Sequence, residues 1–188
     1  CIGAMDIVQI VKLLGKILRS NLEFESESIL LREELELVKC YLDLQKYRFK
    51  DKIEYEINIY VNIDDYKVLP MVIQPIVENS FVHGLEDKVG PGIIRIDIRK
   101  AEDMLEICVA DNGTGIKEEK LRDIRDSLEK QEYDPNRRIG LRNVYQRIKL
   151  RYGERYGLEI SSKVGEGTQV SILLPEREDS SAEGIDSR

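Results

Sequence analysis

The sequence predicts an α+β fold in which helices cover one face of a mixed sheet, with a helical segment ahead of this sandwich. Three observations lead to the prediction. Apolar residues follow helical spacing through most of the first 50 residues, and a strand-like spacing of two begins at Ile53. Two pairs of alternating segments, at residues 93–110 and 158–174, have the pattern of hairpins, and helical stretches lie between them.

Two helices are expected in the first 50 residues. Apolar side chains between residues 6 and 20 fall on one face of a helix, and a second helix is expected from Leu31 to Phe49. An acidic, serine-rich stretch at residues 21–28 separates them. Because the first helix is apolar along one face and isolated in the sequence, pairing with another helix or formation of a homodimer would bury that face.

Strands and helices alternate in the rest of the chain. A half-buried strand is expected at residues 53–61, and Pro70 should open a helix that runs to about His83, with Gly84 as its stop. The remaining elements follow in chain order: a strand at 94–98, a charged turn at 100–103, a strand at 104–110, a helix at 117–130, a polar stretch without periodicity at 131–138, a helix at 140–152, and strands at 158–162 and 168–174 joined by the loop 164–167. After Pro175 the composition predicts a disordered tail.

The composition excludes several classes of protein. A net charge of −7 argues against a nucleic-acid partner, which would need a basic face. No apolar run approaches the ~18–20 residues that span a bilayer, so no membrane contact is expected from this chain itself. The three cysteines, Cys1, Cys40 and Cys108, fit neither a disulfide framework nor a zinc pattern, and a reducing cytosol is the simplest compartment.

Asp111, Gly113 and Gly115 follow a predicted strand directly. Two glycines let the backbone turn sharply and approach a ligand closely. A carboxylate at the strand end can accept a hydrogen bond from an exocyclic amine, as in adenine. An ordinary Asp-Asn-Gly turn is the alternative, and it is the stronger interpretation of this segment taken alone.

Glu78 and Asn79 lie in an otherwise apolar predicted helix. His83 follows Asn79 by four residues and therefore lies on the same helix face. The side-chain amide oxygen of Asn79 is a hard ligand that suits Mg²⁺. The alternative is a solvent-facing strip of an amphipathic helix, and this segment alone does not decide between the two.

Two further glycine segments could contact a ligand. Gly140 opens a helix just after Arg138, and the free N–H groups of such an N-terminus can bind a phosphate. Gly165-Glu166-Gly167-Thr168 could place a hydroxyl beside a ligand. A common glycine at a helix start and an ordinary hairpin loop are the respective alternatives.

The order and spacing of these segments carry more information than any one of them. Four segments of the chain resemble the sequence boxes of the GHKL ATPase superfamily, in the same order. Asn-x₃-His-Gly at 79–84 resembles the N box, and Asp-Asn-Gly-x-Gly-Ile at 111–116 the G1 box. Ile-Gly-Leu-x-Asn at 139–143 resembles the G2 box, and Gly-x-Gly-Thr at 165–168 the final box. One branch is more similar still. The LytS/YesM-type sensor histidine kinases of bacterial two-component systems resemble the chain over residues 7–175, at Leu31-x-Glu-Glu-Leu, Tyr41-Leu, Arg48-Phe49 and Gln74-Pro75-Ile76-Val77-Glu78-Asn79.

This resemblance implies a Bergerat-type two-layer α/β sandwich that binds ATP and Mg²⁺. Asn79 would bind Mg²⁺, Glu78 would polarise the attacking group, and Asp111 would hold the adenine amine, with Thr168 supporting it through water. The implied nucleotide-binding set is Asn79, His83, Asp111, Gly113, Gly115, Ile116, Arg138, Gly140, Leu141 and Thr168. Residues 117–138 would form a mobile lid, from which Arg137 or Arg138 could reach the phosphates.

The chain departs from the family pattern in three places. Arg138 stands where the G2 box usually has a glycine, and Val82 stands where many relatives have a lysine. His83 is the only histidine, whereas the family's phosphoacceptor is a different histidine on a helix that would precede residue 7. The resemblance therefore implies a catalytic fragment of a longer kinase that lacks its own acceptor.

The implied kinase would transfer the γ-phosphoryl of ATP to the acceptor-histidine helix of the parent protein, for relay to a response-regulator aspartate. The chain would be a cytoplasmic domain of a membrane-bound bacterial protein. Its expected parts are residues 1–50 as the remnant of the dimerisation hairpin with a connecting helix, 51–175 as the ATP-binding catalytic domain, and 176–188 as the disordered tail. A GHKL-type ATPase and a non-catalytic nucleotide-sensing or dimerisation module are the alternatives.

Overall fold

The computed structural model describes residues 27–49, 52–86, 88–129 and 140–176. The helix expected at residues 6–20, the polar stretch at 131–138 and the tail from residue 177 lie outside this part of the chain. The predicted roles of Arg137 and Arg138 therefore lie outside the described residues as well. Within the described residues, no helix has the length and apolar character needed to cross a bilayer.

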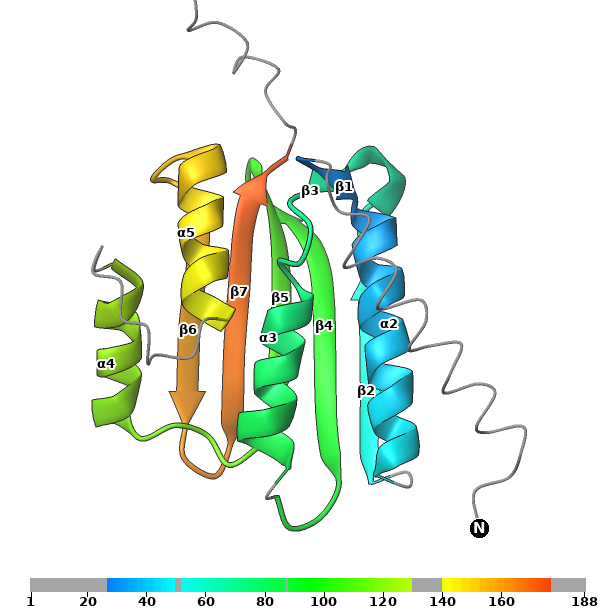
Figure 1. Cartoon of the computed structure of the whole chain (residues 1–188), viewed down its shortest axis with the longest axis vertical. Helices are drawn as coiled ribbons and strands as arrows, with labels where there is room; N and C mark the ends of the chain where they lie inside the picture. Colours follow the sequence, from blue (N-terminus) through cyan, green and yellow to red (C-terminus); the bar gives the residue numbers. More distant parts are fainter. Residues whose placement is uncertain (1–26, 50–51, 87, 130–139, 177–188) are drawn as a thin grey trace, which may run out of the picture.

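A mixed five-stranded sheet forms one layer of the molecule (Figure 1). Its strands lie in the order β2-β4-β5-β7-β6, in which β2 pairs with β4 in parallel and the other neighbours pair antiparallel. They are β2 (Ile53–Ile59), β4 (Gly92–Ala101), β5 (Met104–Asp111), β6 (Gly157–Lys163) and β7 (Gly167–Pro175). A separate short ladder joins β1 (Ile29–Leu30) to β3 (Lys67–Val68), and neither strand was predicted.

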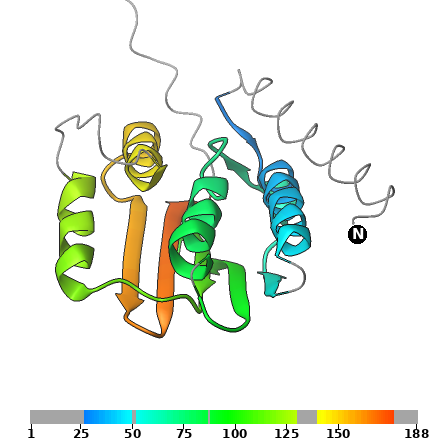
Figure 2. The same cartoon turned by 60° about the horizontal axis from the view of Figure 1, so that its bottom comes forward.

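Helices form the second layer. They are α2 (Leu31–Arg48), the short 3₁₀-helix η1 (Ile63–Asp65), α3 (Gln74–Asn79), the π-helix η2 (Ser80–Leu85), α4 (Glu118–Glu129) and α5 (Gly140–Tyr152). Figures 1 and 2 show α2, α3 and α5 side by side over one face of the sheet, with α4 beyond β6. The predicted α+β sandwich, with a mixed sheet and helices on one face, is confirmed.

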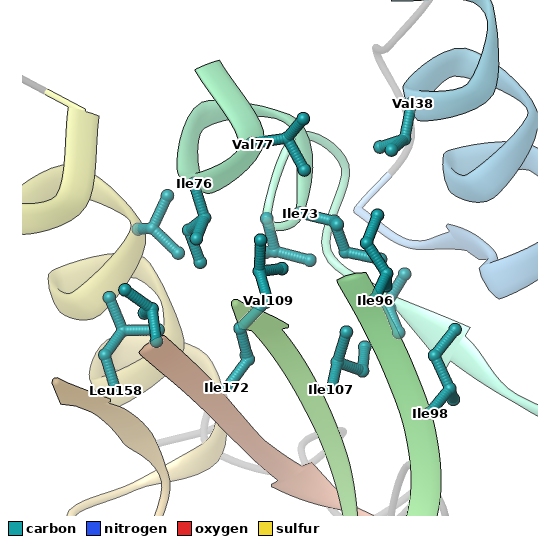
Figure 3. Packing of buried hydrophobic residues seen from close by; sticks show 14 of the residues in the cluster. Val38, Ile73, Ile76, Val77, Ile96, Ile98, Ile107, Val109, Leu158 and Ile172 are labelled. Atoms are coloured by element: carbon teal, nitrogen blue, oxygen red, sulfur yellow. The ribbon is translucent and has the colours of Figure 1, made fainter. Parts of the chain in front are cut away.

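Alternate residues of the strands supply the sheet side of the core. Ile96 and Ile98 of β4 and Ile107 and Val109 of β5 point toward the helices (Figure 3), and all four are fully buried. In the same view they face Val38 of α2, Ile76 and Val77 of α3, and Ile73 just ahead of α3. The period of two that predicted the strands therefore corresponds to one buried face.

The helix predicted from Pro70 begins later and ends later. Met71 has a left-handed backbone with φ of 59°, so the chain turns there and α3 begins only at Gln74. Gly84 does not stop the helix, since η2 runs on to Leu85. Gly84 is needed for another reason: a Cβ there would lie 2.8 Å from the Asp111 carboxylate.

Helix α2 packs into the same core as the sheet. Leu31, Val38 and Leu42 are at most 1% exposed and belong to the main hydrophobic cluster. The Tyr55 hydroxyl of β2 donates to the Asp43 carboxylate of α2 at 2.5 Å. The described compact unit thus includes residues ahead of position 51.

Candidate nucleotide-binding site

Asp111 ends β5, opposite Ile94 of β4 and Thr168 of β7. Its side chain is 8% exposed. Oδ1 accepts hydrogen bonds from the backbone N–H of Gly113 at 2.9 Å and of Thr168 at 3.2 Å. Oδ2 is buried and, within the described part of the chain, makes no hydrogen bond of acceptable geometry. A buried carboxylate oxygen is thus left ready for a donor.

Burial raises the pKa of Asp111 above its ordinary value, although the Gly113 N–H, the Ser80 hydroxyl and the Thr168 N–H each lower it. The Ser80 hydroxyl influences the carboxylate without making a hydrogen bond of good geometry to Oδ2. The positive charge of Lys88 lowers this pKa further, but burial prevails. An N–H group brought to Oδ2 would replace part of the lost hydration. This is the chemistry expected of an amine-binding acid.

Glycines let three segments approach one another around Asp111. A Cβ at Gly113 would collide with the Gly84 carbonyl, and one at Gly115, where φ is +69°, would collide with the Lys163 carbonyl. Gly84 O accepts the Thr114 N–H at 3.0 Å, and Thr114 O accepts the Gly165 N–H at 2.8 Å. The loop after β5 is therefore fixed between η2 and the β6–β7 hairpin.

Thr168 lies in a small hydroxyl network that the sequence did not indicate. Its Oγ1 is 2.9 Å from Ser162 Oγ, which donates to Gly167 O at 2.8 Å and accepts the Ile116 N–H at 2.9 Å. With the Ser162 proton on Gly167, Thr168 must donate to Ser162, which leaves the lone pairs of Thr168 for an amine or a water. Ser162 lies directly opposite Thr168 in the observed register of β6 and β7, and only that register could have indicated it.

Asn79 and Gly140 lie together at the other end of the candidate site. Asn79 is the last residue of α3, and its Nδ2 donates to Pro75 O at 2.7 Å. Gly140 is the first residue of α5, and a Cβ there would lie 3.1 Å from Asn79 Nδ2. The Asn79 side-chain amide thus lies beside the N-terminus of α5, and the free N–H groups of a helix N-terminus attract anions.

A metal at Asn79 would draw few of its ligands from the protein. The described residues contain no group of three or more His, Cys, Asp or Glu side chains that could hold a metal. Mg²⁺ commonly binds one or two protein oxygens, substrate phosphates and water. The single Asn79 amide, next to the first residue of α5, is compatible with that mode.

Glu78 is held by a residue that sequence reasoning did not select. Gln74 Nε2 donates to Glu78 Oε1 at 2.9 Å, one helical turn away. Glu78 is half-buried, and its charge, after burial, contributes to raising the pKa of Tyr41 in α2 to about 12. The Glu78 carboxylate is therefore close enough to α2 for its charge to act on Tyr41.

Three further predicted site residues, His83, Ile116 and Leu141, make fewer contacts with the residues described above. The side chain of His83 is exposed, and its backbone carbonyl accepts a hydrogen bond from Thr114 Oγ1 at 3.4 Å. Ile116 and Leu141 are half-buried and pack against the core. The structure thus groups Asp111, Gly113, Gly115, Ile116 and Thr168 at one end and Asn79 and Gly140 at the other.

A cavity of about 480 Å³ lies elsewhere, between α4, α5 and the strands β6 and β7. Leu128, Tyr145 and Ile160 contribute to its lining, and Arg125 donates to Ile160 O at 2.6 Å. None of the predicted site residues lines it. It is separate from the candidate site.

Comparison with protein families matches residues 64–178 to the model described as histidine kinase-, DNA gyrase B- and HSP90-like ATPase. The chain belongs to this ATPase family. A histidine kinase model matches residues 3–53 in addition. The resemblance to the GHKL superfamily, drawn from four short boxes, is confirmed.

Curated relatives narrow the family to sensor histidine kinases of the LytS/YesM type. Sensor histidine kinase YesM of Bacillus subtilis is 31% identical over 170 residues, which are 90% of this chain and 28% of YesM. Sensor protein LytS of Oceanobacillus iheyensis is 34% identical over 165 residues, 87% of this chain and 28% of LytS. The chain thus spans little more than a quarter of these relatives' length.

Solved structures agree with the fold. The catalytic domain of histidine kinase ThkA superposes with a TM-score of 0.59 at 16% identity, covering 81% of this chain and 97% of that domain. The histidine kinase domain of the Erythrobacter litoralis EL346 blue-light activated kinase gives 0.54 at 15% identity, covering 89% and 73%. The sandwich of sheet and helices is thus that of histidine kinase catalytic domains.

Proposed function

We propose that this chain binds MgATP and transfers its γ-phosphoryl group to a histidine of the parent sensor kinase. The observation that carries the proposal is the buried Asp111 carboxylate, whose Oδ2 is left without a hydrogen bond by the described residues. That oxygen would accept the exocyclic amine of adenine, with Thr168 assisting through water. The glycines at 113 and 115 would let the loop backbone lie against the base.

At the phosphate end, Asn79 would hold Mg²⁺, which neutralises charge on the phosphates. The N-terminus of α5 at Gly140 would bind a phosphate through its free N–H groups. Glu78, oriented by Gln74, would polarise the acceptor imidazole. His83, Ile116, Arg138 and Leu141 would complete the nucleotide-binding set.

The chemistry would rest on positioning and charge neutralisation. The bond between the γ-phosphorus and the bridging oxygen of ADP breaks, and a bond from phosphorus to an imidazole nitrogen forms. The imidazole proton leaves to a base such as Glu78. The phosphoryl group would then pass to a response-regulator aspartate.

The parent protein and its division into parts are also proposed. Residues 1–50 would belong to the dimerisation and linker region, 51–175 to the catalytic domain and 176–188 to a tail, with α2 shared between the first two because it packs into the core. Homodimerisation would run through the N-terminal segment. The chain would face the cytoplasm of a bacterium as part of a membrane protein.

The test combines this chain with a separately purified helical hairpin that carries the acceptor histidine of the parent kinase. With γ-labelled ATP and Mg²⁺, we expect label on that histidine, and none when Asn79→Ala replaces the wild type. Absence of label under all conditions would contradict the proposal. Steady phosphate release without the hairpin would favour an ATPase, and ATP binding without transfer a nucleotide-sensing module.

A further inference from the structure

Helix α3, which carries Glu78 and Asn79, begins without a cap of its own. Its N-cap residue is Ile73, whose side chain cannot accept a hydrogen bond, and Pro75 in the first turn has no N–H. The N–H groups of Ile73 and Gln74 therefore need acceptors from elsewhere in the chain.

Glu34 of α2 supplies those acceptors. Its side chain is fully buried, and Oε1 accepts the N–H of Ile73 at 3.0 Å and of Gln74 at 3.4 Å. Oε2 accepts the N–H of Met71 at 2.9 Å. Burial raises the pKa of Glu34, and these backbone donors lower it. One carboxylate thus caps a helix 37 to 40 residues further along the chain.

Arg147 of α5 holds the same turn from the other side. Its Nη2 donates to Pro70 O at 2.7 Å, and its Nη1 lies 3.5 Å from Met71 O. Between these contacts Met71 keeps a left-handed φ of 59°, which a non-glycine residue adopts only at a cost. The turn is therefore fixed by an acid on α2 and a base on α5.

The turn leads directly to the candidate phosphate end. Gln74 gives its backbone N–H to Glu34 and its side-chain amide to Glu78. Asn79 closes the same short helix and lies against Gly140, the first residue of the helix that carries Arg147. Any shift of the turn would therefore move Glu78 and Asn79 relative to the start of α5.

We propose that Glu34 is a positioning residue of the MgATP site, which sets the start of α3 and, through Gln74, the orientation of Glu78. Glu34 does not touch the nucleotide. Because only the short strand β1 separates α2 from residues 1–28, a displacement of α2 would be passed through Glu34 to the phosphate end. The inference rests on the proposed MgATP binding. It adds Glu34 as a positioning residue and a structural connection from α2 to Glu78 and Asn79.

The test compares Glu34→Gln with Glu36→Gln, which makes the same charge change at an exposed position of the same helix. Calorimetry measures ATP affinity with Mg²⁺ and with a chelator in its place. Glu34→Gln should weaken MgATP binding about 10- to 100-fold, as is typical for partners that orient metal ligands. Metal-free binding should change much less, and Glu36→Gln should match the wild type in both.

The ratio of ATP affinity with Mg²⁺ to that without it should fall in Glu34→Gln. An equal loss of affinity under both conditions leaves this ratio unchanged and would overturn the inference. If Glu34→Gln does not fold, Arg147→Gln perturbs the same turn from α5 and should show the same selective loss; an unchanged ratio there overturns the inference equally. A wild-type chain that binds no MgATP would contradict the proposed function itself. Wild-type binding with an unaffected Glu34→Gln would contradict the positioning role alone.

Discussion

Replacing Asp111 by asparagine keeps the shape of the side chain but reverses what it offers to an adenine. The asparagine oxygen can still accept the N–H groups of Gly113 and Thr168, which now bond to Oδ1 at 2.9 and 3.2 Å. The amide nitrogen then occupies the position of the unpartnered Oδ2 and presents donors to the donor amine of the base. A hydrogen bond to a charged group contributes about 1.5–3 kcal/mol, so ATP affinity should fall roughly 10- to 150-fold.

The assay is calorimetric titration of both proteins with MgATP and with the inosine triphosphate analogue. Inosine carries a carbonyl oxygen where adenine carries the amine, so the wild type should prefer ATP and Asp111→Asn should reverse or abolish that preference. The unliganded variant should melt no lower than the wild type, because burial of the charged carboxylate is costly. An ATP affinity or an ATP-to-ITP ratio that the substitution leaves unchanged would refute the adenine assignment.

Two further predictions concern the fold and its pH dependence. Leu42→Ala removes a side chain of α2 that is 1% exposed, and it should lower the free energy of unfolding in urea titrations by about 2–5 kcal/mol. The control Leu150→Ala, at 91% exposure, should change that free energy by less than about 0.5 kcal/mol. Similar values for the two variants would mean that α2 is not part of the cooperative unit. Since the pKa of Asp111 is raised on folding, its contribution to stability is present below the ordinary value of about 4 and is lost as the pH rises through the raised value. The unfolding free energy of Asp111→Asn minus that of the wild type should therefore increase with pH over this window, and a flat difference would contradict the burial argument.

The adenine end could be predicted from sequence because its signals are local. A strand of alternating apolar residues ends at Asp111, and glycines at 113 and 115 follow within four positions. These features report where the chain turns and where the backbone approaches another segment. Ser162 escaped notice because a serine in a predicted strand carries no such signal until the hairpin register sets it opposite Thr168.

The start of α3 could not be predicted in the same way, since a residue far away in the chain decides it. Proline at position 70 is a sound local signal for a helix start, yet the helix begins four residues later. The reason is energetic: the N–H groups of Ile73 and Gln74 find a buried acceptor in Glu34, and Arg147 binds the carbonyls before them. The motif that contains Glu34 was part of the family resemblance, but the resemblance did not indicate that Glu34 caps α3. The role of a buried acid on one helix can be inferred only when the helix whose N–H groups it accepts is known. Here that helix is α3, which carries Glu78 and Asn79.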